Sequence, residues 1–170
     1  MNIFVLDLDL TKSAEYHIDK HVVKMITEHN QMLSTAHHIL KSKYISNLPK
    51  EERLKNGFVP YNKTHPNHPC SIWVRESLSN YIWLCEATIK LCGEYTYRYN
   101  KTHKGEEIAK FLLNHQPEIK EKGLTKFALA MPDDVKDNDA VISYRNYYKK
   151  YKKHLFSWKN RKIPEWIWED

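Results

Sequence analysis

The chain has 170 residues, of which 41% are hydrophobic and 12% aromatic. This length predicts a single domain over residues 1–170, and the aromatic content argues against intrinsic disorder. No apolar run approaches the roughly 18 residues that cross a membrane, and the start of the chain lacks the pattern of a secretory signal. An odd set of three cysteines suits a reducing compartment better than a disulfide scaffold. We therefore expect a protein of the cytoplasm with no membrane partner.

The chain is basic, with 27 Lys and Arg against 21 Asp and Glu and a formal charge of +6. Eight of these cations fall between positions 140 and 164, where there is no carboxylate. Concentrated positive charge favours partners that carry phosphate, such as nucleotides or nucleic acid. The alternative is that the lysines only keep the surface hydrated.

The first predicted element is a short β-strand over residues 2–7, because positions 3–6 form a nearly continuous apolar run that is typical of a buried strand. A long helix follows from Ser13, a suitable N-cap, to about residue 43. Val22, Ile26 and Leu33 belong to an apolar stripe at helical spacing, and no Gly or Pro interrupts it.

Prolines and a glycine predict an irregular loop over residues 44–68, with one helical turn at 49–55. Three further helices are expected at 70–99, 104–114 and 139–156. The first of these three could be loosened at Gly93, and a second long loop covers 117–137. The sequence thus predicts a mainly α fold of about four helices, the first one long, with a short N-terminal β-strand.

Polar side chains recur at helical spacing along the first predicted helix. They are His17, His21, Lys24, Glu28, Gln31 and His38. Imidazoles titrate near neutral pH and can transfer protons, while lysine and histidine donors suit phosphate. The candidate catalytic residues are therefore His17, His21 and Glu28, and the candidate ligand-binding residues are Lys24 and Gln31. The alternative is an ordinary hydrated helix face.

A second polar cluster lies around the start of the helix predicted from residue 70. Its candidate ligand-binding residues are His65, Asn67, His68, Arg75 and Asn80. Prolines would hold the loop rigid, so that imidazoles, helix N–H groups and an arginine converge on an anion. The alternative is that the histidines cap the helix. His65, His68 and Cys70 are metal-type ligands, but the second ligand pair of a structural zinc site is missing, so no metal is predicted.

Two further clusters place aromatic residues beside cations. Glu94 and Arg98 are spaced i,i+4, so a helix salt bridge is the simple interpretation, and Arg98 is kept as a candidate ligand-binding residue. Around residue 147, tyrosines could stack on bases while basic residues hold phosphates. Tyr144 and Arg145 are the candidates there, although helical spacing equally makes the tyrosines a core-facing stripe. The tryptophans at 158, 166 and 168 are expected in the core or between the subunits of a homo-oligomer.

Several familiar motifs are missing from the sequence. It contains no phosphate-binding glycine loop, no dinucleotide-binding glycine pattern, no nucleophile elbow and no paired CxxC. Enzyme classes that depend on these motifs are therefore disfavoured, and no cofactor is predicted.

Short strings spread over nearly the whole chain carry a family resemblance. They are MNIFVLDLD at the start, YHIDKHVVKM at 16–25, HPNHP at 65–69, WVRES at 73–77, AMPD at 130–133 and PEW at 164–166. In these strings the chain resembles a family of small proteins encoded by large tailed bacteriophages. The resemblance implies a phage accessory protein that acts in the host bacterial cytoplasm, and it implies no particular activity.

The leading hypothesis is a protein that binds, and could hydrolyse, a phosphorylated nucleotide, with cations on the phosphates and rings on the base. For a phage protein this ligand could be a host immune signalling nucleotide, which would make its role counter-defence. One alternative is a DNA-acting base-excision or base-modification enzyme that holds the duplex with its basic C-terminal helix. Another is an inhibitor of a host enzyme that acts through the Trp-rich tail.

Overall fold

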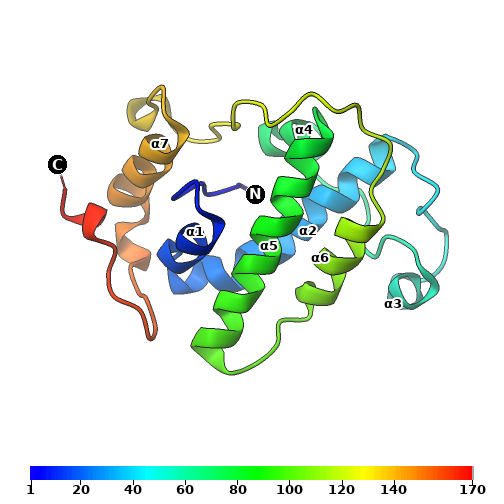
Figure 1. The fold of residues 1–170 in the computed structure, drawn as a ribbon, viewed down its shortest axis with the longest axis horizontal. Coiled ribbons are helices and arrows are strands. Elements are labelled where there is room, and N and C mark those ends of the chain that lie inside the picture. The colour runs from blue at the N-terminus through cyan, green and yellow to red at the C-terminus, as the bar shows by residue number, and fades with distance from the viewer. Residues whose placement is uncertain (170) are drawn as a thin grey trace.

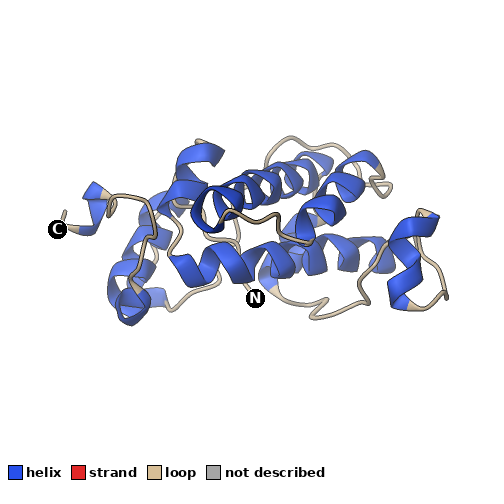
Figure 2. Cartoon of the chain, turned by 90° about the horizontal axis from the view of Figure 1, so that it is seen from below, coloured by secondary structure: helices blue, strands red, loops and turns tan. Residues whose placement is uncertain are grey.

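The computed structural model describes residues 1–169, and all regular structure in that range is helical (Figures 1 and 2). The seven α-helices are α1 (Leu10–Tyr16), α2 (Asp19–Ile39), α3 (Lys50–Arg53), α4 (Pro69–Val74), α5 (Leu78–Tyr99), α6 (Gly105–Asn114) and α7 (Ala140–Tyr147). The shorter turns are η1 (Leu54–Asn56), η2 (Asp133–Val135), the π-helical turn η3 (Tyr148–Lys152), η4 (Lys153–Leu155) and η5 (Glu165–Ile167). None of the helices in this range is long and apolar enough to span a membrane.

The long helix α5 is the centre of the arrangement and packs against α1, α2, α4 and α6. In Figure 1, α7 and the C-terminal segment lie at one end of the molecule beside α1, and α3 lies at the other end. The core side chains come mainly from the N-terminal segment, α2, α5 and α7. They include Phe4, Leu6, Val22, Ile26, Leu33, Leu84, Leu91 and Tyr144.

The predicted β-strand at residues 2–7 is wrong, because no strand forms anywhere in residues 1–169. The apolar run is nevertheless buried as extended chain in the middle of the helices. Side chains take the place of a partner strand: the Leu6 N–H donates to Ser13 Oγ (3.2 Å), and the Leu6 carbonyl accepts from Arg145 Nε (2.9 Å). The sequence therefore predicted the burial of this segment, but it did not predict which groups form hydrogen bonds with its backbone.

The single long helix predicted from residue 13 to 43 is divided into α1 and α2, since His17 and Ile18 have extended backbone angles. Partners from the distant C-terminal segment replace the helical hydrogen bonds at the break. Trp158 Nε1 donates to the Tyr16 carbonyl (2.9 Å), and the Asp19 N–H donates to the Ser157 carbonyl (2.9 Å). The helix ends here because tertiary contacts satisfy its terminal groups.

The helix predicted over 70–99 is also divided, with α4 and α5 separated by residues 75–77. Asn80 Nδ2 donates to the Trp73 carbonyl (2.8 Å), and Ser77 Oγ accepts from the Lys122 N–H (3.0 Å). Helix α5 then continues through Gly93 without a break. With these two divisions and the turn α3, the prediction of about four helices is wrong, although the all-α character is right.

The remaining helices follow the sequence pattern closely. Helix α6 confirms the prediction at 104–114, and the turn predicted at 49–55 is formed by α3 and η1. Asp139 caps α7 by accepting from the Ile142 N–H (3.0 Å). The predicted helix 139–156 is regular only to Tyr147 and continues as η3 and η4.

The start of α6 is an unusually close contact with α2. A Cβ on Gly105 would lie 2.5 Å from Ile26 Cγ2 and 2.9 Å from Asn30 Nδ2. The same Asn30 amide donates to the Gly105 carbonyl (2.8 Å). A residue without a side chain therefore lets α6 pack directly on α2.

Candidate functional site

A pocket of about 660 Å³ lies between α1, α7 and the C-terminal segment. Its volume is in the roughly 300–1,000 Å³ range of small-molecule sites. The lining combines cations, carboxylates and two aromatic rings. The lining residues are Glu15, Tyr16, Arg145, Asn160, Arg161, Lys162, Ile163, Pro164, Glu165, Trp166 and Glu169.

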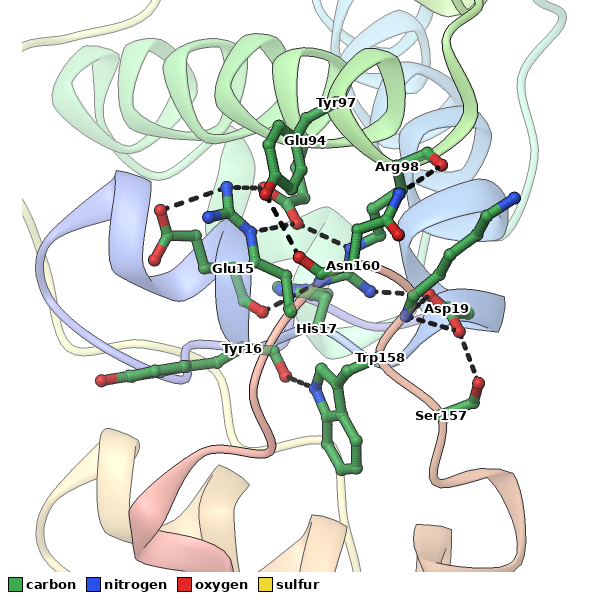
Figure 3. Close-up of polar contacts among 12 residues, drawn as sticks. Glu15, Tyr16, His17, Asp19, Glu94, Tyr97, Arg98, Ser157, Trp158 and Asn160 are labelled. Atoms are coloured by element: carbon green, nitrogen blue, oxygen red, sulfur yellow. Dashed lines mark hydrogen bonds and ion pairs between the residues drawn. The ribbon is translucent and has the colours of Figure 1, made fainter.

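One wall of the pocket is held by a buried ion network on α5 (Figure 3). Glu94 accepts from Arg98 Nε (2.6 Å) and, with both carboxylate oxygens, from Arg161 Nε (3.0 Å) and Nη2 (2.9 Å). Burial raises the pKa of Glu94, but the hydrogen bonds from Arg161 and Arg98 outweigh it and hold the pKa below its ordinary value. Glu94 is therefore charged at neutral pH and fixes Arg161 at the pocket.

Arg98 joins this network to the break between α1 and α2. Its Nη1 donates to Asp19 Oδ1 (2.9 Å), and its Nη2 donates to the Glu15 carbonyl (2.9 Å). Asp19 in turn accepts from Ser157 Oγ (2.5 Å) and from the Lys159 N–H (3.0 Å). The segment that begins at Ser157 is thus anchored on the end of α1 and the start of α2, as Figure 3 shows.

The opposite side of the pocket is formed by Arg145 and two rings. The Arg145 guanidinium lies over the ring of Trp166 (5.2 Å) and that of Tyr16 (5.6 Å), close enough for cation–π attraction. Its Nη2 also lies 3.2 Å from Asp7 Oδ2. Trp166 is 5% exposed, and its buried Nε1 has no hydrogen-bond partner within residues 1–169. The pocket therefore contains an arginine whose orientation is fixed by two rings and a carboxylate.

The pocket lining contains charges of both signs. The cations are Arg145, Arg161 and Lys162, and the carboxylates are Glu15, Glu165 and Glu169. Lys162 is exposed and forms no ion pair in the described part of the chain. Such a lining suits a ligand that has an anionic group at one end and hydrogen-bond donors elsewhere.

The structure places His17 and His21 in the interior, away from this lining. His17 Nδ1 lies 2.6 Å from the Ser13 carbonyl oxygen, and burial lowers its pKa to about 4. His21 Nδ1 lies 2.7 Å from the hydroxyl of Tyr148, its ring stacks on Phe4 (4.3 Å), and burial lowers its pKa to about 3. Both imidazoles are neutral at pH 7 and take part in the packing of the N-terminal segment.

The other candidates on the first predicted helix lie on α2. Glu28 is 3.1 Å from Lys24 Nζ and 3.5 Å from the amino group of Met1. Gln31 is half-buried. His17 is the C-cap of α1 and lies outside α2. The six polar residues expected on one helix face are therefore not all on one helix.

In the cluster around the start of α4, a histidine caps the helix, as the alternative interpretation of the sequence predicted. His68 Nδ1 accepts from the Cys70 N–H (3.2 Å), while His65 and Asn67 are exposed. Arg75 Nη1 donates to the Ser71 carbonyl (2.9 Å). Across residues 1–169, no three His, Cys, Asp or Glu side chains gather as metal ligands would.

Three further candidates are buried and bonded within the fold. Asn80 Nδ2 donates to Thr125 Oγ1 (2.7 Å) as well as to α4, and the Tyr144 hydroxyl donates to the Ala128 carbonyl (2.6 Å). Arg98 belongs to the ion network described above. Arg145 is thus the one predicted site residue in the lining of the pocket.

Sequence reasoning missed most of the pocket. The residues it did not assign to a site are Glu15, Tyr16, Asn160, Arg161, Lys162, Ile163, Pro164, Glu165, Trp166 and Glu169. The concentration of positive charge up to residue 164 and the aromatic tail were the available signals, but they did not show that the tail folds back onto α1. Comparisons with protein-family models, curated proteins and solved structures gave no match.

Proposed function

We propose that the protein binds a phosphorylated nucleotide in the pocket between α1, α7 and the C-terminal segment. The observation that supports this most directly is the position of the Arg145 guanidinium over the rings of Tyr16 and Trp166. The guanidinium offers a phosphate contact, and the half-buried ring of Tyr16 beside it offers a surface on which a base can stack. Nucleotides require both.

The remaining lining supports the same class of ligand. Lys162, which has no ion pair within the described residues, provides positive charge for phosphate oxygens. Glu15 and Glu165 can accept hydrogen bonds from ribose hydroxyls or from the amino group of a base. The mixed charge therefore fits a nucleotide better than it fits a simple anion such as phosphate.

We propose binding without turnover. The histidines predicted to transfer protons would have to lie within hydrogen-bond reach of the substrate. His17 and His21 are buried outside the lining, and burial holds their pKa values near 4 and 3. Together with the resemblance to proteins of large tailed phages, this leads us to propose sequestration of a host immune signalling nucleotide in the host cytoplasm.

The first experiment identifies the ligand. Protein purified from cells is denatured by heat, the released small molecules are analysed by mass spectrometry, and a panel of nucleotides is screened by thermal shift. We expect an intact nucleotide in the supernatant, or a rise of several degrees in the melting temperature for one member of the panel. No released nucleotide and no shift would refute the proposal, and a cleaved product would refute binding without turnover.

A pair of charge variants locates the site. Lys162→Ala removes an exposed cation from the pocket, and Lys63→Ala removes an exposed cation that does not line it. We expect Lys162→Ala to weaken nucleotide binding by about threefold to fivefold, as for one exposed ion pair. The corresponding nucleoside should bind both variants equally, because it has no phosphate.

Salt dependence separates this proposal from duplex binding. A protein that makes 6–10 phosphate contacts to a duplex loses roughly 10³- to 10⁵-fold in affinity between 50 and 200 mM salt. A nucleotide held by a few side chains should lose far less. A steep salt dependence with duplex DNA, and no response to nucleotides, would favour a DNA-acting enzyme instead.

A further inference from the structure

We infer that the nucleotide pocket continues into a second nucleotide subsite beside Trp168, so that the preferred ligand is a short single-stranded oligonucleotide. A second pocket of about 450 Å³ lies next to the first. It is lined by Lys149, Lys153, Phe156, Ile167, Trp168 and Glu169. Glu169 lines both pockets, Trp166 of η5 lines the first, and Trp168, the residue after η5, lines the second. This inference rests on the proposed function, because the first subsite is the nucleotide pocket.

Trp168 is the exposed tryptophan of the chain. Its exposed fraction is 73%, whereas those of Trp73, Trp158 and Trp166 are 2%, 8% and 5%. An indole in water forgoes the burial that usually stabilises a large ring. Its free face is the kind of surface on which an unpaired base stacks in proteins that bind single strands.

Two lysines place positive charge beside this ring. Lys149 and Lys153 are spaced i,i+4 and come from η3 and η4. Lys149 Nζ donates to the backbone carbonyl of Glu169 (2.9 Å), a contact that positions the tail without neutralising the ammonium. Lys153 is exposed and has no ion pair within the described residues. Both charges are therefore available to a phosphate.

The neighbouring lysines, Lys150 and Lys152, interact with other residues and do not line the second pocket. Lys150 pairs with Asp134 (2.5 Å), and Lys152 lies over the ring of Tyr147 (4.9 Å). The turn that carries them is π-helical, a geometry often found at functional sites. Within the described residues, Lys149 and Lys153 are the lysines of these turns that have neither an ion pair nor a cation–π contact, and both line the pocket of Trp168.

The two subsites repeat one chemistry on either side of η5. The first has the half-buried ring of Tyr16 with Arg145 and Lys162, and the second has Trp168 with Lys149 and Lys153. A mononucleotide, which has one base, can use only one ring. Two linked nucleotides can use both, and linkage turns the second contact into an intramolecular one. The structure therefore predicts higher affinity for a dinucleotide than for a mononucleotide.

The test compares thymidine 5′-monophosphate with 5′-phosphorylated di- and tetrathymidylate, and with the adenine series, by titration calorimetry. We expect at least tenfold tighter binding of the dinucleotide by the unmodified protein. Trp168→Ala and Lys153→Ala should abolish that gain and leave mononucleotide affinity unchanged. Leu124→Ala, which removes a side chain that is 50% exposed and lines neither pocket, should have no effect.

The possible failures are distinguishable. Equal affinity for mono- and dinucleotides would overturn the second subsite and leave the proposed function standing. The second subsite would also be refuted if Trp168→Ala weakened binding of both ligands equally, or if a duplex bound more tightly than the single strand. Binding of neither ligand would overturn the proposed function, and the second subsite with it. Unchanged melting temperatures of the variants would show that these effects are not due to unfolding.

Discussion

The ion pair between Glu94 and Arg98 provides a quantitative test of the fold, since a matched exposed pair lies on the next helix. The Arg98 side chain is 0% exposed and donates to Glu94, to Asp19 and to the Glu15 carbonyl. Arg98→Met keeps an unbranched side chain of similar length but removes all of these bonds. Two carboxylates and a carbonyl then lose a charged donor, and one of the carboxylates, Glu94, is only 4% exposed.

Breaking a buried ion pair by removing one partner costs about 3–5 kcal/mol. We expect Arg98→Met to lower the free energy of unfolding by this amount. In a chain of this length, each kcal/mol lost lowers the melting temperature by about 2–4 °C. We therefore expect the melting temperature of Arg98→Met to fall by roughly 6–20 °C. Urea unfolding at pH 7, followed by circular dichroism, measures the free energy directly.

The pH dependence separates lost charge interactions from lost packing. Hydrogen bonds hold the pKa of Asp19 and of Glu94 below their ordinary values against the effect of burial. Such carboxylates contribute stability above their unfolded pKa, and this contribution is lost as the pH falls through the folded pKa. The difference between the unmodified protein and Arg98→Met should therefore be largest at neutral pH and shrink on acidification below about 4.

The control is Lys110→Met. Lys110 and Glu106 form an i,i+4 pair on α6, and the lysine side chain is 56% exposed. This substitution should leave the free energy of unfolding nearly unchanged, because water already solvates both groups. If Arg98→Met cost no more than Lys110→Met, the reasoning from burial would be wrong.

Three further predictions concern histidines, glycines and the C-terminal anchor. The histidines whose pKa is lowered by burial to between about 3 and 4 are His17, His21, His29 and His37. Their folded pKa lies below the unfolded value, so we expect stability to fall as the pH drops from 6.5 to 4, by about 1.4 kcal/mol per pH unit for each histidine that stays neutral when folded. Gly105→Ala should destabilise the protein by about 1–3 kcal/mol, because its Cβ would lie 2.5 Å from Ile26 Cγ2, whereas Gly93→Ala, where nothing lies within 4 Å, should stabilise α5 by about 0.5–1 kcal/mol. Asp19→Asn should weaken nucleotide binding and speed proteolysis after residue 156, since Asp19 accepts hydrogen bonds from Ser157 and Lys159.

Each of these has a measurement that can contradict it. A flat free energy of unfolding between pH 7 and 5 would contradict the neutral, buried state of the histidines. Equal melting temperatures for the two glycine variants would show that α6 does not lie as close to α2 as described. An Asp19→Asn variant with unchanged affinity and unchanged proteolysis would show that the C-terminal segment is anchored by other contacts.

The local sequence pattern was sufficient to predict those elements that are stabilised by contacts between residues close together in the chain. The apolar stripe of α2, the uninterrupted run of α5 and the cap of α7 at Asp139 all depend on neighbours within a few positions. The burial of residues 3–6 was also readable, because a continuous apolar run is costly to expose to water. Arg145 could be proposed as a site residue from its basic and aromatic surroundings.

The remaining features depend on partners that are distant in the sequence. The break between α1 and α2 exists because Ser157 and Trp158 bind backbone groups that a continuous helix would have bonded internally. The same contacts bring the tail back onto α1 and create the pocket. Periodicity carries no information about such long-range hydrogen bonds, so the sequence predicted one long helix and an exposed face of histidines. By itself the sequence determined that the chain is mainly helical and that residues 3–6 are buried. Tertiary structure decided where the helices end, which histidines are buried as neutral groups, and where a ligand can bind, because each of these depends on long-range contacts that satisfy or desolvate polar groups.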